Sequence, residues 1–124
     1  MSIATLSARV HAMTPQDELI GSLTKERIAL AVRYAGAQSV EDPGEAHRWL
    51  AYALGTEVPN YLFMKVALAY EQRERLEDCD LEFWYEMPST ASNRERLQAN
   101  ADKAIEFEVA RLTTRLCTQL GVTA

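Results

Sequence analysis

The stretch "DPGEAHRWLAYALG", residues 42–55, carries the start, the body and the end of one helix. Asp42 is a typical N-cap, and Pro43 suits the first helical position because its missing N–H would have no partner there. Glu45 follows the cap by three residues, and Gly55 is typical of a helix end. Because the apolar residues of the core face are mostly small, a neighbouring helix can approach closely. This core face is predicted at Ala46, Leu50, Ala53 and Leu54.

Helical spacing of apolar residues continues on both sides of this stretch. Upstream, a helix is expected to start at Thr24 and to loosen at Gly36. Downstream, another helix starts near Pro59. We therefore expect packed helical hairpins in residues 24–75. Their further core faces are predicted at Ile28, Ala31, Val32 and Ala35, and at Leu62, Val66 and Ala69.

The longest predicted helix follows the pattern "SNRE", a capping box in which Ser92 caps the helix and Glu95 reaches back to it. Apolar residues then repeat at helical spacing for about 24 residues, up to Gly121, which corresponds to a length of about 36 Å. A helix of this length would brace the others. Its predicted core face consists of Leu97, Ala101, Ala104, Ile105, Val109, Leu112, Leu116 and Leu120.

Length and composition are those of an ordinary globular domain. The chain has 124 residues, of which 48% are hydrophobic and 25% charged. We predict an all-α fold, a single-domain bundle of five or six helices with a long C-terminal helix. Its parts are N-terminal docking helices in residues 1–22, helical hairpins in 24–75, an acidic-aromatic connector in 76–91 and the long helix in 92–121.

The connector contains the acidic-aromatic segment "LEDCDLEFWYEM", residues 76–87, with five carboxylates, no basic residue and three consecutive aromatic residues. Residues 74–86 hold six acidic residues against one arginine and so account for the whole net charge of −5. The apolar spacing of the segment fits both a strand and a helix. Since no other segment is a convincing strand to pair with it, we favour a helix.

The residue types that carry metal or catalytic chemistry are not gathered in this sequence. The carboxylates and the thiol of residues 78–82 have no nearby histidine, no second thiol and no EF-hand spacing. Carboxylates on both sides of Cys79 would raise the pKa of its thiol and make it a poor nucleophile. His11 and His47 stand alone, and no phosphate-binding loop or nucleophile elbow occurs. We expect no metal, no cofactor and no enzyme activity.

Charge and hydropathy bear on partners and location. The mildly acidic balance lacks the positive field that draws nucleic acid, so we expect no nucleic-acid partner. Residues 1–13 lack a signal-peptide pattern, and no run reaches the roughly 18 apolar residues of a membrane span. Cys79 and Cys117 have no C-x-x-C partner and are expected to be buried or half-buried thiols, with a single disulfide as the alternative. These features predict a soluble, cytoplasmic protein with no membrane partner.

Aromatic residues that cannot all face the core predict a protein interface. Tyr61 and Phe63 flank Leu62 too closely to share its face, so some aromatic side chains of this region must be exposed or lie between subunits. The carboxylates and rings of the acidic-aromatic segment would match a partner with a basic, apolar groove. A solvated loop and mimicry of nucleic-acid phosphate are the alternatives. The predicted interface comprises Tyr61, Phe63, Glu77, Asp78, Asp80, Glu82, Phe83, Trp84, Tyr85 and Glu86.

Three short patterns occur in succession within residues 22–69. They are Arg27 with Ala31 in an alanine-rich helix, His47 with Arg48 and Ala51 on the next helix, and a turn at Pro59 and Asn60 before a third helix. In this outline the segment resembles a recurring block of small helical proteins of tailed bacteriophages, several of them encoded among virion and head–tail genes. The acidic-aromatic segment and the long C-terminal helix lie outside the block.

This resemblance implies a non-enzymatic phage structural or virion-assembly protein of the head–tail or neck region, of a kind that can form rings. Its partners would be further copies of itself, as a homo-oligomer, and a neighbouring virion protein. It would lie in the cytoplasm of a bacterial host and be incorporated in the virion. The residues leave a second interpretation open, namely a small acidic regulatory or inhibitory protein that binds a basic host protein.

Overall fold

The computed structural model describes residues 23–78 and 90–123, and in this part of the chain helices are joined by turns without any strand. The helices are α2 (Lys25–Gln38), α3 (Pro43–Leu54), α4 (Asn60–Asp78) and α6 (Thr90–Leu120). The predicted all-α class and the long C-terminal helix are confirmed. The described part contains four helices, so the predicted total of five or six is not confirmed. The docking helices predicted in residues 1–22 lie outside the described residues.

Local contacts start α2 and α3, and end α3, where the sequence predicts. Thr24 Oγ1 accepts a hydrogen bond from the N–H of Arg27 at 3.2 Å, and Asp42 Oδ1 accepts one from the N–H of Glu45 at 3.0 Å. These bonds satisfy N–H groups that the start of a helix leaves without an internal partner. Gly55 ends α3 in the left-handed conformation, with a φ of 67°, which glycine adopts without a Cβ clash.

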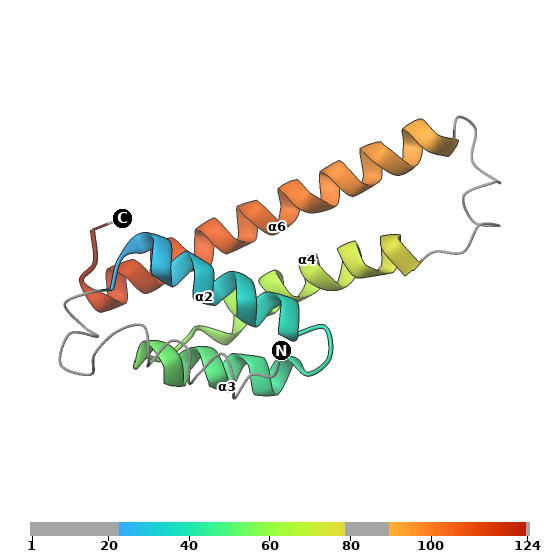
Figure 1. The fold of residues 1–124 in the computed structure, drawn as a ribbon. Coiled ribbons are helices and arrows are strands. Elements are labelled where there is room, and N and C mark those ends of the chain that lie inside the picture. The colour runs from blue at the N-terminus through green and yellow to red at the C-terminus, as the bar shows by residue number, and fades with distance from the viewer. Residues whose placement is uncertain (1–22, 79–89, 124) are drawn as a thin grey trace.

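The four helices pack as an antiparallel pair covered at one end. In Figure 1, α6 runs the length of the molecule, α4 lies along it in the opposite direction, and α2 and α3 cover the half of the pair near the C-terminus. The largest contacts are those of α4 with α6, of α2 with α6 and of α2 with α3. The C-terminal part of α4 and the N-terminal part of α6 extend beyond α2 and α3 (Figure 1). We call this extension, residues 71–78 and 94–104, the arm.

The core forms where faces of all four helices meet. Ile28 of α2, Leu50 of α3, Phe63 of α4 and Leu112 of α6 are fully buried there. The core faces predicted for the first three helices are confirmed. They are Ile28, Ala31, Val32 and Ala35; Ala46, Leu50, Ala53 and Leu54; and Leu62, Val66 and Ala69.

Only the C-terminal part of α6 follows the predicted core face. From Ile105 onward the predicted residues are buried, apart from the half-buried Leu120. Leu97 and Ala101 are half-buried, and Ala104 is exposed. The reason is that these three residues line an open groove between α4 and α6, to which α2 and α3 contribute no residue.

Both helices that flank the predicted connector extend into it. α6 begins at Thr90, two residues before the predicted cap Ser92, because a helix that has started gains a hydrogen bond with each further residue. α4 continues to Asp78. Residues 76–78 and 90–91 of the predicted connector 76–91 are therefore helical, and its remaining residues, 79–89, lie outside the described part.

Gly36 lies in a close contact between α2 and α4. A Cβ atom at this position would lie 2.6 Å from Tyr70 Cδ2 and 2.8 Å from Val66 Cγ1. The sequence predicts that this glycine loosens the end of the helix, but α2 continues to Gln38. The close approach of α4, rather than the helix end, therefore requires the glycine.

Side chains from two helices hold the loop between α3 and α4. His47 Nε2 lies 2.7 Å from the carbonyl oxygen of Val58, which is itself buried. From α6, Gln119 Nε2 donates hydrogen bonds to Thr56 Oγ1 at 3.1 Å and to the carbonyl oxygen of Glu57 at 2.6 Å. These contacts fix the start of α4, and with it the direction in which the arm leaves the core.

Candidate interaction surface

The two predicted interface residues at the start of α4 differ in their exposure to solvent. Tyr61 is 60% exposed, whereas Phe63 is 0% exposed and packs in the core. The prediction that Phe63 lies at an interface is wrong because α4 contacts α2, α3 and α6 together. Its buried arc is wide enough for both Leu62 and Phe63, which point about 100° apart on a helix.

Two of the predicted acidic interface residues fall on α4. Glu77 Oε1 lies 2.9 Å from Arg73 Nη1, one turn back on the same helix. Asp78 is the last residue of α4. The rest of the predicted interface lies outside the described residues; it consists of Asp80, Glu82, Phe83, Trp84, Tyr85 and Glu86.

An open groove of about 400 Å³ lies on the arm, between α4 and α6. Apolar groups of both helices form most of its surface, and none of its lining residues belongs to α2 or α3. We call it the arm groove. It is lined by Gln72, Arg75, Leu76, Leu97, Asn100, Ala101 and Ala104.

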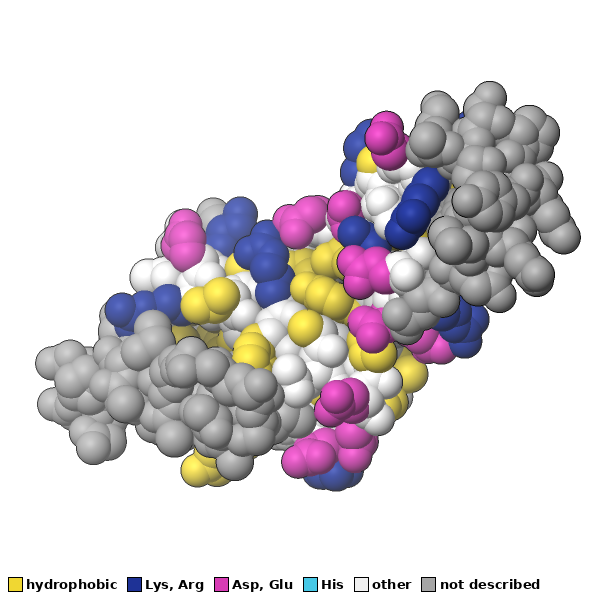
Figure 2. Space-filling view, turned by 45° about the vertical axis from the view of Figure 1, so that its right-hand side comes forward, with side chains coloured by type: hydrophobic (Ala, Val, Ile, Leu, Met, Phe, Trp, Pro, Cys, Tyr) yellow, Lys and Arg dark blue, Asp and Glu magenta, His cyan; other side chains and the backbone are white. Residues whose placement is uncertain are grey.

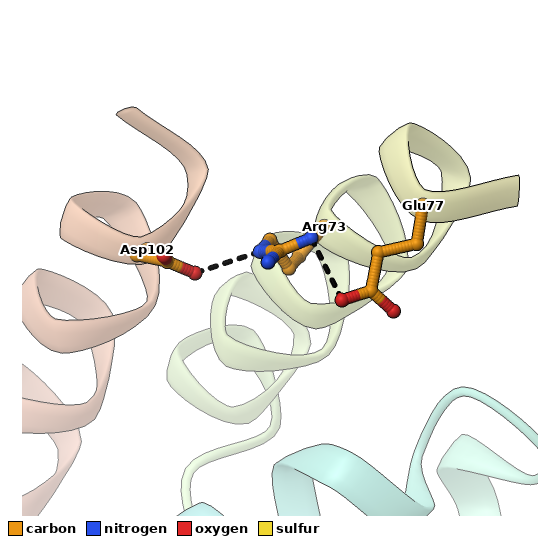
Figure 3. A network of polar contacts seen from close by, with 3 residues as sticks. All are labelled: Arg73, Glu77 and Asp102. Carbon is orange, nitrogen blue, oxygen red and sulfur yellow. Dashed lines mark hydrogen bonds and ion pairs between the residues drawn. The ribbon is translucent and has the colours of Figure 1, made fainter. Parts of the chain in front are cut away.

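Arg73 joins the two helices of the arm (Figure 3). Its Nε donates a hydrogen bond to Asp102 Oδ1 at 2.7 Å, and its Nη1 forms an ion pair with Glu77. The hydrogen bond with Asp102 raises the pKa of Arg73, so the guanidinium stays charged. The Arg73 side chain is less exposed than either carboxylate, which favours a fixed geometry. This contact holds α6 against α4 along the arm.

Towards the core, a second ion pair ties α6 to α2. Arg33 Nη2 donates a hydrogen bond to Glu106 Oε2 at 2.7 Å. The hydrogen bond with Glu106 raises the pKa of Arg33. The two ion pairs link α6 to a different helix each, four residues apart along α6, and so set the position of α6 where the arm begins.

The face of α4 that points to solvent carries an apolar row, which we call the outer stripe: Tyr61, Met64 and Leu68. These side chains are 60%, 36% and 51% exposed. Their spacing of three and four residues places them on one side of the helix, and Gln72 and Arg75 continue that side into the arm groove. On the face of the molecule that Figure 2 shows, hydrophobic side chains lie among acidic and basic ones. Neighbouring exposed apolar residues such as those of the outer stripe are typical of a contact surface.

Among the described residues, His47 and Cys117 make contacts that support the fold. His47 contacts the backbone of Val58. Cys117 is fully buried, and burial raises the pKa of its thiol, which keeps it protonated. Within residues 23–78 and 90–123, no three His, Cys, Asp or Glu side chains gather as a metal site.

The arm groove is not predicted by the sequence. Leu97, Ala101 and Ala104 are predicted as core residues, and no pattern in the sequence sets Leu68 apart. The signal that could have shown it is helix length, since α4 and α6 have 19 and 31 residues against 14 and 12 in α2 and α3. Two short helices cannot cover the whole side of two long ones.

Comparisons with protein-family models, with curated proteins and with solved structures found no match. In the described part of the chain, no helix combines the length and the apolar character needed to cross a bilayer.

Proposed function

We propose that this protein is a non-enzymatic assembly protein that associates with copies of itself through exposed helical faces. The observation that carries this proposal is the outer stripe, Tyr61, Met64 and Leu68, which runs along α4 towards the arm groove. Tyrosine and methionine are enriched at protein interfaces, and a row of them on a rigid helix presents a preformed contact surface.

The setting we propose is virion assembly in the head–tail or neck region of a tailed bacteriophage. The support is the resemblance of residues 22–69 to small helical phage proteins. These residues form α2, α3 and the first half of α4, which together build the base from which the arm extends. In this proposal the base is the common scaffold, and the arm with the acidic-aromatic segment contacts a neighbouring virion protein.

The mass of the full chain in solution tests self-association. Native mass spectrometry and light scattering over a range of concentrations should show a defined multiple of the monomer mass. A closed ring would support the assembly function further. A strict monomer at the highest concentration would contradict it.

The charge distribution favours a second function, binding of a basic host protein by a small acidic regulator. Residues 74–86 hold six acidic residues and one arginine, and Glu77 extends that charge onto the arm. Such a concentration of charge speeds encounter with a positively charged partner.

Neutral substitutions test the second function with immobilised oligolysine as the probe. The variant under test carries Glu77→Gln, Asp78→Asn, Asp80→Asn and Glu82→Gln. Its retention should be lost at moderate salt while its helical circular dichroism stays the same, and unchanged retention would rule the acidic segment out. The matched control removes as many exposed carboxylates elsewhere, with Glu26→Gln, Glu41→Gln, Glu57→Gln and Glu95→Gln.

A further inference from the structure

We draw no further inference here: the strongest candidate, the exposed apolar surface that the outer stripe and the arm groove form along α4, carries nothing beyond the proposed self-association, because nothing in the part of the chain that the structure describes shows what covers it.

Discussion

Gly36 determines at a single position how closely α2 can approach α4. An added methyl group would overlap Tyr70 and Val66 in the buried contact. We predict that Gly36→Ala lowers the free energy of unfolding by about 1–3 kcal/mol, the usual cost of overpacking, even though alanine favours a helix by about 1 kcal/mol over glycine. Urea denaturation followed by circular dichroism measures this.

Gly44 provides the control for Gly36. It lies in the first turn of α3, and a Cβ there would meet its nearest neighbours only at 3.5 Å and beyond. Gly44→Ala should therefore be neutral or slightly stabilising. Equal urea midpoints for the two variants would show that the space around Gly36 does not limit the packing.

Tyr70 gives the molecule a pH dependence in the alkaline range. Burial raises the pKa of its hydroxyl group above the ordinary value of 10, with Glu106 adding to the rise and Arg33 opposing it. Because the unfolded chain then loses the proton at a lower pH than the folded chain, the stabilisation is complete below pH 10 and is lost as pH rises through the folded pKa. Above pH 10, the stability of the Tyr70→Phe variant should fall less steeply than that of the natural sequence. Urea midpoints at several pH values measure this. Parallel curves would contradict this.

At the scale of the element, the arm consists of two helices that, within the described residues, pack mainly against each other. The Arg73–Asp102 ion pair and the apolar residues of the groove join them, whereas the rest of α4 and α6 also contacts α2. Segments with few buried contacts open locally at lower free energy than the core. The arm should therefore exchange its amide hydrogens faster than the parts of α4 and α6 that lie against α2.

Asp102→Asn should open the arm without unfolding the base. The Asp102 carboxylate is 61% exposed, so the change in global stability should stay below about 1 kcal/mol. Amide exchange should accelerate in residues 73–78 and 94–102 and stay the same in α3, as measured by hydrogen–deuterium exchange mass spectrometry. Glu108→Gln, which removes an ion pair within α6 alone, is the matched control. Acceleration throughout the molecule would show that the ion pair supports the whole fold.

At the scale of the whole molecule, the proposed self-association through the outer stripe would link stability to concentration. Association that occurs only in the folded state stabilises that state by mass action. The Tm should therefore rise with protein concentration for the natural sequence and stay constant for Leu68→Glu, which places a charge in the outer stripe. Leu30 on α2 is similarly exposed, at 58% against 51% for Leu68, so Leu30→Glu is the matched control and should behave like the natural sequence. Calorimetry over a 100-fold range of concentration measures this, and a constant Tm for the natural sequence would contradict self-association.

The sequence alone determined the helical class, the starts of α2 and α3, the end of α3 and the core faces of α2, α3 and α4. These features depend on short-range physics. A cap such as Asp42 bonds to an N–H three residues away, and a core face such as that of α3 follows from the helical repeat. Such signals are contained within one helix, so they can be recognised without knowing its neighbours.

Only the tertiary structure decided which apolar residues remain exposed. Phe63 is buried because α4 packs against α2, α3 and α6, and Ala104 is exposed because it lines the arm groove, to which α2 and α3 contribute no residue. The glycine at position 36 is needed because Tyr70 of another helix lies against it. Burial depends on which surfaces meet, and that depends on the lengths and the crossing of separate helices, which no local pattern contains.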